Sequence, residues 1–131
     1  MRGVDTRSPI ARVRGLGSAQ EGVQHWWAHR LTAIALVPLS IWFVAGMVAL
    51  TGASHAEAAH WVAQPLNAVL MILTLGLVFH HGQLGLQAAI EDYVHAEGAK
   101  LALLIAVKLL ALVLALAGIV AVLRLTLGAT A

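Results

Sequence analysis

Hydrophobic residues in this chain gather into three long runs separated by shorter breaks. The runs predict membrane-spanning helices at residues 29–51, 62–90 and 101–127. Each is at least as long as the roughly 20 residues that a helix, rising 1.5 Å per residue, needs to cross about 30 Å of hydrocarbon. The prediction leaves four segments outside the membrane: residues 1–28, 52–61, 91–100 and 128–131. We therefore predict an all-α integral membrane protein with three transmembrane helices.

The composition supports this prediction. Hydrophobic residues make up 60% of the chain and charged residues only 11%, whereas charged residues are about a quarter of an average soluble domain. A soluble domain of 131 residues could not bury so much apolar surface, but a bilayer can cover it. The absence of cysteine excludes disulfides, thiolate metal sites, iron–sulfur ligation and covalent c-type haem attachment by this chain.

Basic residues predict how the chain is oriented. Five arginines precede or open the first run: Arg2, Arg7, Arg12, Arg14 and Arg30. The segment 52–61 has no lysine or arginine, and the segment 91–100 has Lys100. Because lysine and arginine gather in cytoplasmic flanks, we predict a cytoplasmic N-terminal arm and 91–100 loop, with 52–61 and 128–131 in the periplasm. This orientation signal explains the basic arm more simply than nucleic-acid binding does.

Other residues near the predicted membrane surfaces have ordinary structural explanations. Trp26 and Trp27 at the cytoplasmic entry and Trp61 at the outer end fit the aromatic belts of membrane proteins. Lys108 and Arg124 belong to the third run, and their long stems can carry the charges toward the membrane surface. The outer-loop residues His55 and His60 have no metal-ligand context and are expected at the surface.

Two adjacent histidines interrupt the second hydrophobic run. His81 precedes Asp92, at the predicted cytoplasmic surface, by a helical rise of about 16 Å, which places it near the membrane midplane. A polar group there is costly and is a functional hypothesis by default. His81 and His80 are therefore either ligands, for which neutral imidazole suits haem iron, or hydrogen-bonding links between helices. Adjacent helical residues diverge by about 100°, so a haem here needs its second axial ligand from another chain.

The helical faces favour His81 as the ligand, with His80 as the fallback. His81 shares a stripe with Gly85, Ala88 and Asp92, and His80 shares one with Leu84, Gln87 and Glu91. Gly85 lies one turn from His81, where a missing side chain admits a flat macrocycle or a closely packed helix.

Polar residues at the cytoplasmic ends of the spans allow two interpretations. Tyr93, with Asp92 beside it, can donate a hydrogen bond to a quinone carbonyl, or the two can simply anchor and cap the span. Arg30 can pair with a haem propionate or orient a quinone, or it can extend to lipid phosphates.

The order of these motifs resembles a known family. The motifs are Gly17-Ser18-Ala19, Gly22, His25-Trp26-Trp27, Arg30-Leu31-Thr32-Ala33-Ile34, and then His81, Gly85 and Asp92-Tyr93. Together they resemble the hydrophobic membrane anchor subunit of succinate dehydrogenase, of the smaller D type and in its bacterial form. The resemblance extends from about Arg14 to the end of the third span. The other anchor type of this family has a different sequence at its start and directly after its histidine ligand. In this chain His81 is followed by Gly82-Gln83-Leu84.

The resemblance implies a non-catalytic subunit of respiratory complex II in the bacterial inner membrane. In that complex a flavoprotein oxidises succinate, and an iron–sulfur subunit passes the electrons to ubiquinone. Two anchor subunits form one helix bundle that holds haem b and shapes the quinone site. By this resemblance His81 is one axial haem ligand, Tyr93 hydrogen-bonds the quinone beside Asp92, and Arg30 serves the quinone site or the propionates.

Two other functions remain open at this point. One is a purely structural anchor or assembly factor whose histidines link helices. The other is a small transport subunit whose histidines relay protons, although the first and third spans offer no polar pathway apart from Lys108.

Overall fold

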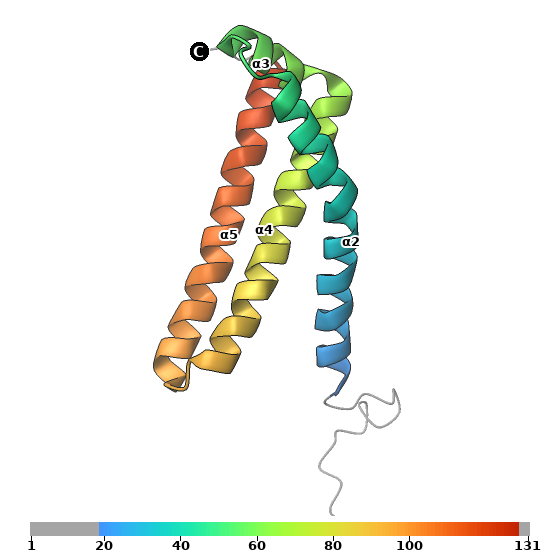
Figure 1. Ribbon diagram of the computed structural model, residues 1–131. Coiled ribbons are helices and arrows are strands. Elements are labelled where there is room, and N and C mark those ends of the chain that lie inside the picture. The colour runs from blue at the N-terminus through green and yellow to red at the C-terminus, as the bar shows by residue number, and fades with distance from the viewer. Residues whose placement is uncertain (1–18, 129–131) are drawn as a thin grey trace, which may run out of the picture.

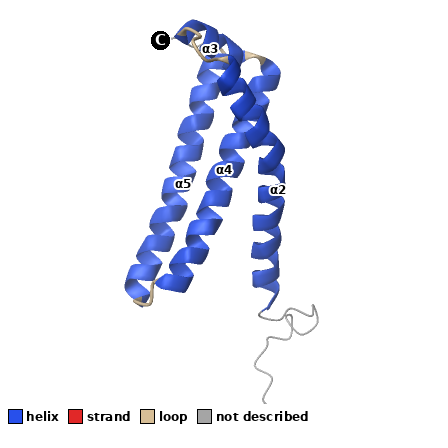
Figure 2. Ribbon diagram, viewed as in Figure 1, coloured by secondary structure: helices blue, strands red, loops and turns tan. Residues whose placement is uncertain are grey.

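The computed structural model describes residues 19–128, which form four helices joined by short turns (Figures 1 and 2). The helices are α2 (Ala19–Ala49), α3 (His55–Ala63), α4 (Pro65–Tyr93) and α5 (Glu97–Thr126). Three helical segments, Gly22–Ala49, Pro65–Tyr93 and Glu97–Thr126, are long and apolar enough to cross a membrane. Residues 19–128 contain no strand, so the predicted all-α fold with three spanning helices is confirmed. The arginines before Arg30, and residues 129–131, lie outside the described residues.

The helices extend beyond the predicted spans. Residues 19–28, expected in the polar arm, continue α2 beyond the first hydrophobic run. They can do so because a helix satisfies its backbone hydrogen bonds internally, inside a bilayer or outside it. Residues 55–63, expected mainly in an outer loop, form the short helix α3. Pro38 lies inside α2, which runs on through it.

A capping box starts α3. Ser54 is the N-cap, and its hydroxyl accepts the backbone N–H of Glu57 at 3.3 Å. The Glu57 carboxylate in turn accepts the Ser54 backbone N–H and hydroxyl, both at 2.7 Å. These hydrogen bonds, the backbone one first, lower the pKa of Glu57. The cap is therefore complete at neutral pH and weakens as the pH falls through that lowered pKa. Pro65 then occupies the first turn of α4, where its missing N–H costs nothing.

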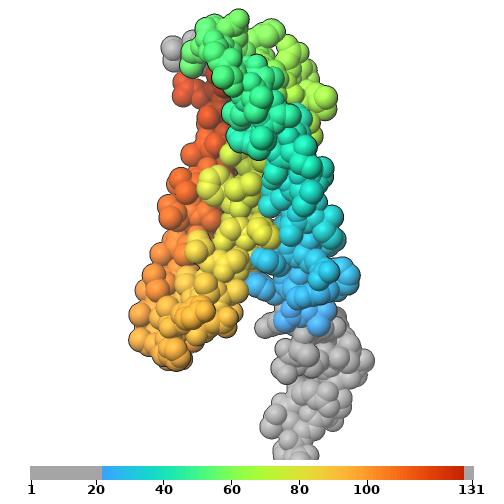
Figure 3. Space-filling view, in the orientation of Figure 1, coloured from blue at the N-terminus to red at the C-terminus, as the bar shows by residue number. Residues whose placement is uncertain are grey.

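Helix α4 is the centre of the arrangement. It packs against α2 on one side and α5 on the other, and among the described residues the backbones of α2 and α5 do not approach each other closely. Helix α3 lies at the end of the bundle where α4 begins and α5 ends (Figure 1). Side chains of α2 meet those of α4 across the space between their ribbons (Figure 3). Helices α4 and α5 approach each other closely at Gly118, where an added Cβ would lie 3.1 Å from the Leu75 side chain.

A stacked tryptophan pair holds the C-terminal part of α2. The rings of Trp42 and Trp61 lie 5.5 Å apart between centroids and 18° from parallel. Gly46 lies directly beneath the Trp61 ring, because a Cβ there would come within 2.6 Å of two ring carbons. Any side chain at position 46 would displace the stacked ring. The pair therefore ties α2 to α3.

The chain buries very little of its hydrophobic surface by itself. Among the described residues the buried hydrophobic side chains are Leu39, Ala68, Leu84 and Val122. Large aliphatic residues on all three long helices stay exposed, including Ile41 and Leu66 at about two thirds exposure or more. Such surface is stable against lipid or other apolar helices but not against water. The three helices therefore form an incomplete bundle, which leaves room for further helices beside them.

Candidate functional site

A hydrogen bond between two helices holds His81 in place. The Oγ1 of Thr32 in α2 lies 2.9 Å from the Nδ1 of His81 in α4, although the residues are 49 positions apart in the sequence. Thr32 is only 8% exposed, so water does not compete for this bond. The same hydroxyl lies 2.8 Å from the Ala28 carbonyl oxygen and 3.0 Å from that of His29. His81 is thereby attached to α2.

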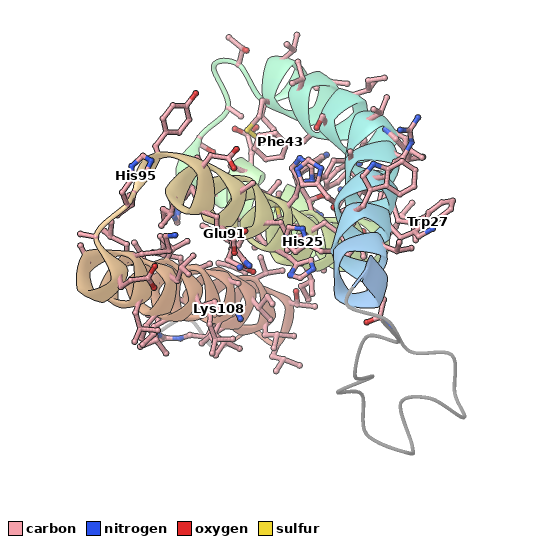
Figure 4. The ribbon with its side chains drawn as sticks, turned by 90° about the horizontal axis from the view of Figure 1, so that it is seen from below. His25, Trp27, Phe43, Glu91, His95 and Lys108 are labelled. Carbon is pink, nitrogen blue, oxygen red and sulfur yellow. The ribbon has the colours of Figure 1, made fainter. Side chains whose placement is uncertain are left out.

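Further imidazoles of α2 lie beside this bond. The His29 ring stacks on that of His81, with centroids 4.3 Å apart and planes 25° from parallel. His25, one turn earlier, has a buried Nε2 without a hydrogen-bond partner among the described residues. Figure 4 shows His25 between α2 and α4, while Trp27 points away from the other helices. His25, His29 and Thr32 thus form a polar stripe on the face of α2 toward α4.

The other edge of the His81 ring is free. Its Nε2 forms no hydrogen bond with any residue in the range 19–128. An added Cβ at Gly82 or Gly85 would meet nothing within 4 Å, so the helix next to His81 is open. No cluster of three or more metal-ligating side chains could hold a bare metal ion in the described part of the chain. An iron that already has four porphyrin nitrogens needs only one ligand from this chain, and His81 can supply it.

The structure separates His80 from His81. His80 is exposed and lines a groove of about 280 Å³ between α4 and α5, together with Gln83 and Lys108. His81 instead meets α2 through Thr32 and His29. The two histidines therefore belong to different interfaces of α4, as the helical faces in the sequence predicted.

A row of hydrogen-bonded polar side chains continues from the groove to the C-terminal end of α4, and the sequence indicated only that two of them, Gln87 and Glu91, share a helical face with His80. Gln83 donates to the Gln87 side-chain oxygen at 3.1 Å, and Gln87 donates to the Glu91 carboxylate at 2.9 Å. Figure 4 shows Glu91 between α4 and α5. Gln83 is buried, and this bond satisfies part of its amide. The four-residue spacing of three polar residues in an apolar helix was the signal that could have revealed the row.

The remaining predicted site residues lie apart from His81. Tyr93 is 82% exposed at the end of α4, a helical rise of about 18 Å from His81. Among the described residues, neither Tyr93 nor the exposed Asp92 forms a side-chain hydrogen bond or ion pair. The guanidinium of Arg30 lies over the Trp26 ring, 5.1 Å from its centroid. The side chains of Tyr93, Asp92 and Arg30 are therefore not engaged in holding the helices together.

Comparison with known proteins identifies the family. Residues 5–116 match the family model described as succinate dehydrogenase/fumarate reductase transmembrane subunit. The succinate dehydrogenase hydrophobic membrane anchor subunit of Rickettsia bellii is 34% identical over 119 residues, which cover 90% of this chain and 94% of that protein. The protein of the same name from Paracoccus denitrificans is 31% identical over 100 residues, covering 76% of this chain and 78% of that protein.

No solved structure matches the chain. The family match covers most of the sequence, including all the residues from which the resemblance was drawn except the last part of the third span. The resemblance to the hydrophobic membrane anchor subunit is thereby confirmed, and the chain belongs to the succinate dehydrogenase/fumarate reductase transmembrane subunit family.

Proposed function

We propose that this chain is the D-type anchor subunit of complex II, that His81 is one axial ligand of a haem b, and that the cytoplasmic end of α4 contributes to the ubiquinone site. The family match supports an anchor subunit of succinate dehydrogenase. The observation that carries the haem proposal is the hydrogen bonding and the open surroundings of His81. Its Nδ1 is hydrogen-bonded to Thr32, its Nε2 has no partner in residues 19–128, and Gly85 leaves open space one turn away.

The haem is shared with a second anchor subunit in this proposal. The family resemblance assigns one ligand, His81, to this chain, and His80 lies on a different interface. The second axial ligand therefore comes from the partner anchor, whose helices would cover the exposed apolar surface of α2 and α4. The bound haem supplies a one-electron redox centre in the membrane. This chain holds it by the His81 nitrogen and by the shape of the surrounding helices.

The quinone proposal rests on residues that the fold leaves free. Tyr93 is exposed and has no structural hydrogen bond among the described residues, so its phenol can donate to a quinone carbonyl. Asp92 is its neighbour, and Arg30 lies toward the same membrane surface on α2. Electrons reach the quinone from the flavoprotein and iron–sulfur subunits. Residues of this chain bind and orient the quinone, and Arg30 serves either this site or the haem propionates.

A bacterial inner-membrane location with a cytoplasmic N-terminus completes the proposal. Arg30 and Lys100 flank the end of the bundle that holds Tyr93, whereas segment 52–61 has no lysine or arginine. Since the chain has no cysteine, labelling of a single introduced cysteine shows on which side of the membrane that position lies. A membrane-impermeant maleimide should label His95→Cys in inverted vesicles and His55→Cys in intact spheroplasts. The reverse pattern would contradict the orientation.

A purely structural anchor is the second candidate. The Thr32–His81 hydrogen bond by itself would serve that role, since polar side chains commonly link helices in membranes. The structural anchor predicts no haem signal that depends on His81, and spectra of the assembled complex separate the two functions.

The haem proposal is tested by reduced-minus-oxidised spectra of the purified complex, comparing the parent with His81→Leu and His80→Leu. His81→Leu should abolish or shift the b-type α-band because it removes an axial ligand, while His80→Leu should leave the band in place. Immunoblots of the four subunits control for assembly. An unchanged band in assembled His81→Leu complex would refute haem ligation by this chain and leave the structural anchor.

The quinone proposal is tested with Tyr93→Phe, which removes only the phenolic hydroxyl. Loss of one hydrogen bond of about 0.5–1.5 kcal/mol should raise the KM for a short-chain ubiquinone by a factor of about 2 to 13. Succinate oxidation with an artificial acceptor that takes electrons before the membrane should not change. If the quinone KM and kcat both stay at the parent values, Tyr93 does not bind the quinone.

A further inference from the structure

The hydroxyl of Thr32 has one proton but three neighbours. They are the carbonyl oxygens of Ala28 and His29, at 2.8 and 3.0 Å, and the Nδ1 of His81 at 2.9 Å. Carbonyl oxygens can only accept, so the Thr32 proton must point at them if those two contacts are hydrogen bonds. A helical threonine commonly donates to carbonyls three and four residues earlier. The third contact is then satisfied only if Nδ1 of His81 donates to the Thr32 oxygen.

This arrangement selects one tautomer of His81. A neutral imidazole carries a single N–H, so a proton on Nδ1 leaves a lone pair on Nε2. In the other tautomer Thr32 would have to turn its proton away from both carbonyls. Nε2 would then carry an N–H that has no acceptor within residues 19–128, and the hydrocarbon of a bilayer would offer it none. The hydrogen-bond pattern therefore favours the tautomer that can bind a metal through Nε2.

Two further contacts keep this arrangement fixed. Thr32 is buried, so its hydroxyl has no access to solvent that could replace His81. The stacked ring of His29 covers one face of the His81 ring and limits its rotation. Thr32 and His29 both belong to α2, so the first spanning helix positions the side chain of His81 in the second, α4.

We propose that Thr32 is a positioning residue for the haem ligand: its hydroxyl accepts the Nδ1–H of His81, fixes the tautomer and ring plane, and leaves Nε2 for the iron. This inference rests on the proposed ligation by His81. Hydrogen bonding to the distal nitrogen of a ligating histidine increases its basicity and orients the ring, and loss of such a partner typically weakens metal binding about 10- to 100-fold.

The test compares Thr32→Val with Thr32→Ser in the assembled four-subunit complex. Valine keeps the shape but lacks the acceptor, whereas serine keeps the hydroxyl. Thr32→Val should move the haem midpoint potential to a more positive value, because a less basic imidazole stabilises ferric iron less. It should also shift the g-values of the oxidised haem and speed haem transfer to an excess of an apo-haemoprotein about 10- to 100-fold. Thr32→Ser should match the parent in all three measurements.

Parent-like potential, g-values and haem transfer in Thr32→Val would overturn the inference. Equal changes in Thr32→Val and Thr32→Ser would also overturn it, because the hydroxyl would then not be the cause. An unchanged b-type α-band in assembled His81→Leu complex would instead refute the proposed ligation by His81. The two failures are therefore distinguishable.

A double variant covers the case in which Thr32→Val yields too little complex. If Thr32 acts through His81, then adding Thr32→Val to His81→Leu should not reduce assembly further, since the imidazole N–H that needs an acceptor is already gone. The inference fails if Thr32→Val lowers the yield of assembled complex by the same factor in the His81→Leu background as in the parent. Thr32 would then have a structural role that is independent of His81.

Discussion

The Thr32–His81 hydrogen bond is the interaction on which the N-terminal half of α2 depends for its contact with α4. His81 lies within a helix that is long and apolar enough to cross a membrane. The hydrocarbon of a bilayer offers no water to an imidazole, so a ring nitrogen there needs another partner. The structure provides one for Nδ1 and none, within residues 19–128, for Nε2. Toward the C-terminal end of α2 the Trp42–Trp61 stack against Gly46 ties α2 to α3. Between these two contacts α2 buries only a few residues, so the His81 bond is a specific polar contact in an otherwise apolar packing of α2 on α4.

The two sides of α4 have different chemistry, which explains why adjacent histidines can have different roles. Toward α2 there are a buried threonine and stacked imidazoles around His81. Toward α5 there are His80, Lys108 and the Gln83–Gln87–Glu91 row, which continues to the C-terminal end of the helix. Helix α4 thus has polar residues on two sides and an apolar surface elsewhere. It needs a neighbouring helix on each polar side. Family membership as a transmembrane subunit of succinate dehydrogenase or fumarate reductase agrees with such an incomplete bundle.

Much of this organisation could be predicted from the sequence because it depends on local patterns. The three spanning helices followed from the lengths of the hydrophobic runs, and the different orientations of His80 and His81 followed from the 100° step of a helix. Thr32 was not identified as the partner of His81, because nothing in the sequence relates positions 49 residues apart on different helices. Gly46 was missed for the same reason, since only the fold places Trp61 against it.

The central claim is that the Nε2 of His81 binds the haem iron, and chemical rescue tests it most directly. In His81→Gly the imidazole is removed while the helices and Thr32 stay in place, so added imidazole can occupy the vacated site. The account predicts that His81→Gly complex lacks the parent b-type α-band, that imidazole restores it, and that His80→Gly needs no rescue. A parent-like band in assembled His81→Gly complex before imidazole is added would contradict the account.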